Sequence, residues 1–93
     1  MRRVVLFKRK VDSDIPEFTA ALAKLKTLDQ RMSGMTTWWL QMNIGNEGMW
    51  DAALVADFDD LDALRTYESD QEHVKAATSV AAVSEFAVFD SAD

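Results

Sequence analysis

TTWWLQMN at residues 36–43 and WDAALVADF at residues 50–58 lie on either side of a short loop, residues 45–48, that begins and ends with glycine. Apolar side chains recur at every second position in both stretches, which is the period of a β-strand. Trp38 and Trp39 are neighbours, so they point to opposite faces of the first strand. Two alternating stretches around a short glycine-containing loop predict an antiparallel hairpin in the middle of the chain.

On the N-terminal side of this hairpin, the sequence predicts a strand followed by a helix. Residues 3–10, RVVLFKRK, contain a β-branched and aromatic run whose apolar side chains point to both faces. Asp14 and Glu17 have the spacing of a helix-capping pair, and Pro16 fits the first helical turn. The apolar residues of this segment recur at helical spacing and form one stripe: Ile15, Phe18, Leu22 and Leu25.

On the C-terminal side, the sequence predicts a second helical region and a last strand. DDLD at residues 59–62 places acidic groups where a helix N-terminus favours them. Ser69-Asp70 resembles an internal cap, which predicts a break near residues 68–70 and a further helix over residues 71–81. Residues 85–90, EFAVFD, alternate as a strand does. The inward residues expected of the two helical segments are Leu61, Leu64, Tyr67, Val74, Ala77, Val80 and Ala81.

The order β-α-β-β-α-β predicts an α+β, ferredoxin-like fold in a single domain over residues 1–93, with both helical regions on one face of an antiparallel four-stranded sheet. Helices on one face leave the other uncovered, yet the strands carry large apolar side chains on both faces. A single chain would expose roughly several hundred Å² of contiguous apolar surface, more than a monomer usually tolerates. We therefore expect a second copy of the chain to cover it, in a symmetric homodimer.

Composition and charge exclude several classes of function. The chain has 48% hydrophobic and 28% charged residues, no cysteine and one histidine, His73. This excludes a disulfide scaffold, a cysteine-ligated metal centre, a cysteine nucleophile and a site that needs two imidazoles from one chain. The net charge of −6 argues against nucleic acid as a partner. Residues 1–31 hold eight basic and four acidic residues (+4), and residues 32–93 hold two and twelve (−10), so the two poles can pair between copies.

The sequence also argues against a membrane and against secretion. No apolar run approaches the ~20 residues that a membrane-spanning helix needs. The apolar run at residues 4–7 is shorter than the about 7–15 residues of a signal-peptide core. Since the chain has no cysteines that need an oxidising compartment, we expect a cytoplasmic protein.

Several segments resemble one known family. They are RVVLFK at residues 3–8, WDAALVADF at residues 50–58, LDALRTY at residues 61–67 with His73 after it, and VFD at residues 88–90. Together they resemble the stress-responsive A/B barrel (Dabb) family over nearly the whole chain. The resemblance implies a dimeric α/β barrel, in which two four-stranded sheets meet face to face with the helices outside. It also implies relatives that are mostly of unassigned chemistry.

The same resemblance implies candidate catalytic residues. A plant polyketide cyclase of the family uses a histidine and a tyrosine of the second helical region, and these positions look like His73 and Tyr67. A histidine can act as a general base near neutral pH, and a tyrosine can donate a hydrogen bond to a developing enolate. The chain departs from the family at two places: Arg3 stands where a histidine is common, and DQEH at residues 70–73 keeps only the second histidine of a His-Pro-x-His motif. Arg3 can hold an anionic or carbonyl oxygen, but it cannot act as a base near neutral pH.

Two classes of function stay open at this point. A stress-responsive A/B barrel homodimer that binds a small apolar molecule in the barrel interior needs no catalysis. A cofactor-free enzyme, polyketide cyclase-like or monooxygenase-like, requires Tyr67 and His73 to line one pocket. The residues that we expect to line the ligand pocket are Arg3, Leu6, Trp38, Trp39 and Trp50.

We expect neither a cofactor nor a metal. Some relatives of this architecture bind haem through one helix histidine, and His73 with nearby tryptophans could do so, but aromatic residues at strand spacing are more often core. DFDDLD at residues 57–62 lacks the glycine at the sixth position and the oxygen ligand at the fifth position of a calcium loop. We interpret it as a strand end followed by a helix cap.

Overall fold

The computed structural model describes residues 1–29, 31–45 and 47–92. In this part of the chain the elements follow the predicted order, with the second helical region divided into two helices. Their bounds are β1 (Arg2–Arg9), α1 (Ile15–Lys26), β2 (Met35–Met42), β3 (Ala52–Phe58), α2 (Leu61–Ser69), α3 (Gln71–Val83) and β4 (Ser84–Ser91).

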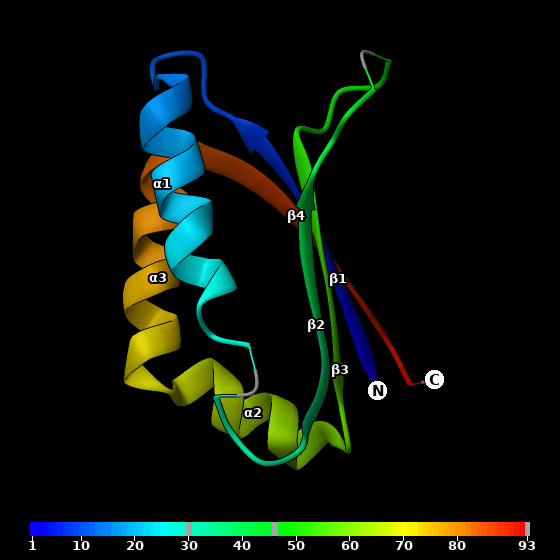
Figure 1. Ribbon diagram of the computed structural model, residues 1–93. Helices are drawn as coiled ribbons and strands as arrows, with labels where there is room; N and C mark the ends of the chain where they lie inside the picture. Colours follow the sequence, from blue (N-terminus) through cyan, green and yellow to red (C-terminus); the bar gives the residue numbers. More distant parts are fainter. Residues whose placement is uncertain (30, 46, 93) are drawn as a thin grey trace.

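The strands form one antiparallel sheet in the order β2-β3-β1-β4, with the helices on one side of it (Figure 1). β1 is therefore a central strand: Val5 pairs with Leu54 of β3 on one side and with Val88 of β4 on the other. β2 and β3 pair as the predicted hairpin. The ferredoxin-like fold predicted from the order of elements is confirmed.

Aspartate caps begin all three helices, as the sequence predicted. The side chains of Asp14, Asp60 and Asp70 each accept a hydrogen bond from the backbone N–H three residues further on, at 2.7, 2.8 and 3.3 Å. A side-chain acceptor at this position satisfies a backbone donor that the helix itself leaves unpaired. Asp70 has an extended backbone with ψ 129°, so it ends α2 and begins α3 in one residue.

The predicted third strand is shorter than expected and begins at Ala52 instead of Trp50. The Trp50 carbonyl accepts a hydrogen bond from the side chain of Asn43 at 2.8 Å. The Asp51 N–H donates to the carbonyl of Phe7 on β1 at 2.7 Å, outside the strand ladder. The predicted strand ends elsewhere differ by one residue, but the first helix ends at Lys26, earlier than the sequence predicts from Arg31 in its last part and Ser33-Gly34 after it. The predicted loop at residues 45–48 includes position 46, which lies outside the described residues.

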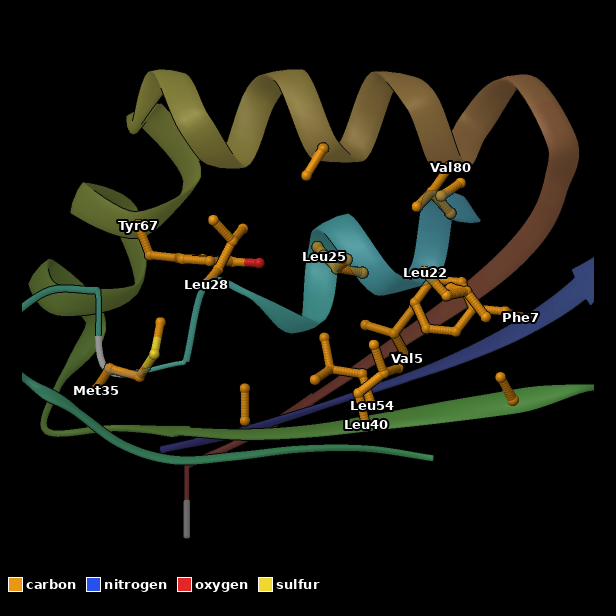
Figure 2. Packing of buried hydrophobic residues seen from close by; sticks show 14 of the residues in the cluster. Val5, Phe7, Leu22, Leu25, Leu28, Met35, Leu40, Leu54, Tyr67 and Val80 are labelled. Carbon is orange, nitrogen blue, oxygen red and sulfur yellow. The ribbon is translucent and has the colours of Figure 1, made fainter. Parts of the chain in front are cut away.

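The hydrophobic core lies between the helices and one face of the sheet (Figure 2). Val5 and Phe7 of β1 are buried there, whereas their neighbours Val4 and Leu6 are only partly buried. In the described part of the chain, no helix lies against the opposite face (Figure 1). We call this opposite face the open face; the apolar residues that the register places on it are Val4, Leu6, Trp39, Ala53, Val55, Ala87 and Phe89.

Four helical residues that we expected to face inward are exposed: Ile15, Leu61, Val74 and Ala81. The first two are the first residues of their helices, where they extend beyond the core. In α3 the buried residues are Ala76 and Val80, four positions apart on one helix face. Val74 precedes Ala76 by two residues, about 200° around the helix, so it points to solvent.

Candidate functional site

A pocket of about 160 Å³ lies between α3 and the helix-facing side of β1 and β4. Its walls are mostly apolar, and its polar groups come from Arg3 on β1, Tyr67 on α2 and His73 on α3. The remaining lining residues are Val5, Phe7, Leu25, Leu54, Ala77, Val80, Phe86 and Val88. An apolar pocket with a few converging polar groups is the usual form of a small-molecule site.

The break between α2 and α3 brings Tyr67 and His73 together. Their ring centroids are 3.9 Å apart, with the ring planes inclined by 39°. Tyr67 extends from α2 into the space between helices and sheet, and its hydroxyl points to the interior (Figure 2). The rings of Phe58 and Trp38 pack against it at 5.2 and 5.6 Å. Tyr67 and His73 therefore line one pocket, which is the arrangement that the enzymatic alternative requires.

Burial sets the protonation of this pair. Desolvation raises the pKa of the Tyr67 phenol well above its usual value, against the opposing charge of Arg3. Desolvation also lowers the pKa of His73 below 6.5, and a hydrogen bond to the Glu68 carbonyl opposes the shift. At neutral pH the tyrosine is thus a proton donor in a hydrogen bond, and the histidine is an uncharged imidazole.

The contact of His73 with the backbone assigns its tautomer. Its Nδ1 lies 3.4 Å from the carbonyl oxygen of Glu68, which can only accept. Nδ1 therefore carries the hydrogen, and Nε2 carries the lone pair. His73 is half-buried, and it lines a pocket whose walls are mostly apolar. A neutral imidazole in such a position can accept a proton from a bound molecule.

Arg3 is fixed at the polar end of the pocket by two carboxylates. Its Nε and Nη2 donate to the two carboxylate oxygens of Asp90 at 2.8 and 3.0 Å. Its Nη2 also lies 3.8 Å from Oε2 of Glu68. The Asp90 hydrogen bonds raise the pKa of Arg3 further above its usual value, so the guanidinium is charged at every physiological pH.

The five residues that we expected to line one ligand pocket lie on both sides of the sheet, so they do not line a single pocket. Leu6, Trp39 and Trp50 line a separate hollow of about 240 Å³ that also includes Gln41 and Ala53 of the open face. Trp38 lies on the helix face, where it packs against Tyr67 but does not line the 160 Å³ pocket. Of the five, only Arg3 lines the 160 Å³ pocket together with Tyr67 and His73. The separation follows from strand alternation, because Leu6 and Arg3 are an odd number of residues apart.

Sequence reasoning missed Asp90 and most of the apolar walls. Asp90 is directly opposite Arg3 in the β1–β4 register, and an opposite charge on the paired strand was the signal that could have identified it. For α3, the signal was the spacing of His73, Ala77 and Val80, which places all three on one helix face.

Residues 1–29, 31–45 and 47–92 contain no group of three or more His, Cys, Asp or Glu side chains placed to hold a metal ion. None of the helices in these segments has the length and apolar character to cross a membrane.

Comparison with known proteins gives one family and a set of structural relatives. A family model described as Stress Responsive A/B Barrel Domain (Dabb) matches residues 1–93. No curated protein matches the chain. A dimeric protein of unknown function with a ferredoxin-like fold from Bacteroides fragilis is 27% identical, with a TM-score of 0.81 over 95% of this chain and 90% of that one.

Two more distant structures share the fold. A dimeric ferredoxin-like protein of unknown function from Jannaschia sp. is 19% identical, with a TM-score of 0.83 over 99% of this chain and 97% of that one. SnoaB, a cofactor-independent oxygenase from Streptomyces nogalater, is 20% identical, with a TM-score of 0.72 over 99% of this chain and 92% of that one.

Proposed function

The chain belongs to the stress responsive A/B barrel domain (Dabb) family, and we propose that it binds a small, largely apolar molecule in the pocket beneath α3. The observation that supports this most is the convergence of Arg3, Tyr67 and His73 on one end of an otherwise apolar pocket. A pocket of about 160 Å³ is close to the roughly 150 Å³ of a cavity that holds one benzene ring. A single-ring ligand with one polar substituent fits these dimensions.

Titration with acetophenone, a single ring with a carbonyl group, tests this proposal. In ¹⁵N-edited NMR spectra we expect saturable shifts of the backbone amides of the lining residues. Ala77→Leu adds three carbons to the pocket wall and should abolish the shifts. Ala81→Leu makes the same change on an exposed side of α3 and is the matched control. Binding that survives Ala77→Leu would contradict the proposed location.

A second function, cofactor-independent proton abstraction, is favoured by the contact between Tyr67 and His73. Nε2 of His73 would take a proton from the carbon next to a ligand carbonyl. The carbon–carbon double bond then forms as the carbonyl becomes an enolate, whose oxygen accepts hydrogen bonds from Tyr67 and Arg3. Because the chain has one histidine and Arg3 cannot act as a base, His73 must also return the proton.

Exchange of the methyl hydrogens of acetophenone for deuterium in D₂O tests this chemistry directly. The wild-type protein should accelerate the exchange, His73→Gln should remove the acceleration, and Tyr67→Phe should lower it by roughly ten- to a hundredfold. Acetophenone that binds but exchanges at the solvent rate would refute proton abstraction and leave the binding proposal intact.

We also propose that a second copy of the chain covers the open face. Its apolar side chains include Trp39 and Phe89, which expose 49% and 66% of their surface in a single chain. The Bacteroides fragilis and Jannaschia relatives are described as dimeric, which supports the same arrangement here. Light scattering after size exclusion at micromolar concentration should give about twice the chain mass of 10.5 kDa. A monomer under these conditions would contradict the proposal.

A further inference from the structure

Building on the proposed binding function, we propose that Asp90 makes the pocket selective for uncharged molecules with a carbonyl or hydroxyl oxygen and against carboxylates. A buried arginine in a ligand pocket ordinarily suggests an anionic ligand, because a guanidinium binds a carboxylate through two parallel hydrogen bonds. Here that arrangement is already occupied within the chain, since Asp90 holds the Nε and Nη2 side of Arg3 at 2.8 and 3.0 Å.

The charges around Arg3 sum to a negative value. Asp90 and Glu68 are the two carboxylates close to the guanidinium, so this group of three side chains has a net charge of −1. Asp70, at the start of α3, is paired with Arg31 at 2.6 Å and adds no net charge. A ligand carboxylate would have to displace Asp90 or lie beside two carboxylates in a partly desolvated pocket, and both are unfavourable.

The uncharged oxygen of a ligand carbonyl or hydroxyl neither has to displace Asp90 nor is repelled by the two carboxylates. The guanidinium has five N–H groups, and Asp90 uses two of them, so Arg3 can still donate to a carbonyl while it stays paired. The Tyr67 hydroxyl, which points to the interior (Figure 2), can also donate a hydrogen bond to such an oxygen. These donors favour the binding of an uncharged ligand oxygen, and the two carboxylates repel a ligand carboxylate. Specific binding sites often combine attraction of one ligand with repulsion of its competitor.

Acetophenone and benzoate test the inference because they have nearly the same shape and differ in charge at pH 7.5. We expect wild-type protein to bind acetophenone at least tenfold more tightly than benzoate, measured by the NMR titration above. Asp90→Asn removes one carboxylate and frees the guanidinium, so it should reduce this preference at least tenfold by strengthening benzoate binding. Glu68→Gln alters an exposed side chain and should shift the preference in the same direction by a smaller factor.

Asp57→Asn is the matched control. Asp57 holds Arg2 through the same two-bond geometry, at 2.8 and 2.9 Å, but on the open face of the sheet. This variant changes the net charge of the chain equally and should leave the acetophenone-to-benzoate ratio unchanged.

The outcomes separate this inference from the function on which it rests. If neither probe shifts the lining residues of wild-type protein, the binding function itself is refuted. If wild-type protein binds both probes equally, or if Asp90→Asn and Glu68→Gln leave the ratio unchanged, only the charge selectivity is refuted. Dispersed NMR spectra of each variant establish that the fold is intact, and Glu68→Gln tests the inference even if Asp90→Asn fails to fold.

Discussion

Trp38 and Trp39 are adjacent in the sequence but lie on opposite faces of the sheet. Replacement of Trp38 should therefore affect folding, and replacement of Trp39 should affect dimerisation. Trp39 exposes 49% of its surface on the open face. For a side chain of roughly 250 Å², about 120 Å² is left for a partner to cover. At about 25 cal/mol per Å² this amounts to about 3 kcal/mol per chain and about 6 kcal/mol per dimer.

Association recovers only part of this transfer energy, because interface side chains are ordered at the same time. We therefore expect Trp39→Ala to weaken dimerisation by at least about 3 kcal/mol, a roughly hundredfold increase in Kd. Trp38 instead packs against Tyr67 under the helices, so Trp38→Ala should lower the free energy of unfolding by about 3–5 kcal/mol.

Sedimentation equilibrium measures the dimer, and urea denaturation of each variant measures unfolding at a fixed protein concentration. Val11→Ala removes apolar atoms from a fully exposed side chain in the β1–α1 connection and serves as the control, with no expected effect on association. If Trp39→Ala leaves dimerisation unchanged, or if both tryptophan variants alter folding and association alike, the assignment of the two faces is refuted.

Three further predictions concern stability. Since burial lowers the pKa of His73, the unfolded chain binds its proton first, so the free energy of unfolding should decrease as pH falls through about 6.5. His73→Gln should flatten this part of a pH series of urea denaturations, and an unchanged slope would contradict the shift. The ion pair with Arg2 lowers the pKa of Asp57 to about 2, so its stabilisation is present above pH 3.8 and is lost between there and about pH 2. Asp57→Asn should remove this acid dependence, and calorimetry across that range measures it. Gly34 and Gly48 both have positive φ, 90° and 83°, but only at Gly34 would a Cβ lie 2.9 Å from a side-chain atom of α2. Gly34→Ala should therefore lower Tm more than Gly48→Ala, and equal effects would show that backbone strain alone accounts for both.

The order of strands and helices could be predicted because each element has its own local signal. Asp14, Asp60 and Asp70 cap the three helices at the places where the sequence has acidic residues before apolar stripes. Residues such as Ile15 and Leu61 were assigned to the core wrongly, because helical spacing fixes a direction around the helix axis but not whether the sheet extends far enough to cover the first turn.

The pocket was harder to predict, because it depends on the angle between α2 and α3. Six residues at 100° each would place Tyr67 and His73 about 240° apart on a continuous helix, pointing away from each other. The extended backbone of Asp70 interrupts the helix, and the rings meet at 3.9 Å. The sequence indicated a break at this place, but the direction of α3 after the break is set by its packing against α1 and the sheet. Only the resemblance to the Dabb family paired these two residues in advance.

The two arginines at the start of β1 lie on opposite faces of the sheet, which we propose have different functions. Arg2 and Arg3 are neighbours, each is held by a carboxylate directly opposite on an adjacent strand, and strand alternation sends them to opposite faces. Arg3 and Asp90 lie at the pocket, whereas Arg2 and Asp57 lie on the open face that we propose a second copy covers. None of the residues that line the pocket belongs to the apolar set of the open face. Substitutions on the two faces therefore act on ligand binding and on association separately, and a dissociated Trp39→Ala chain still contains every side chain on which the binding argument rests.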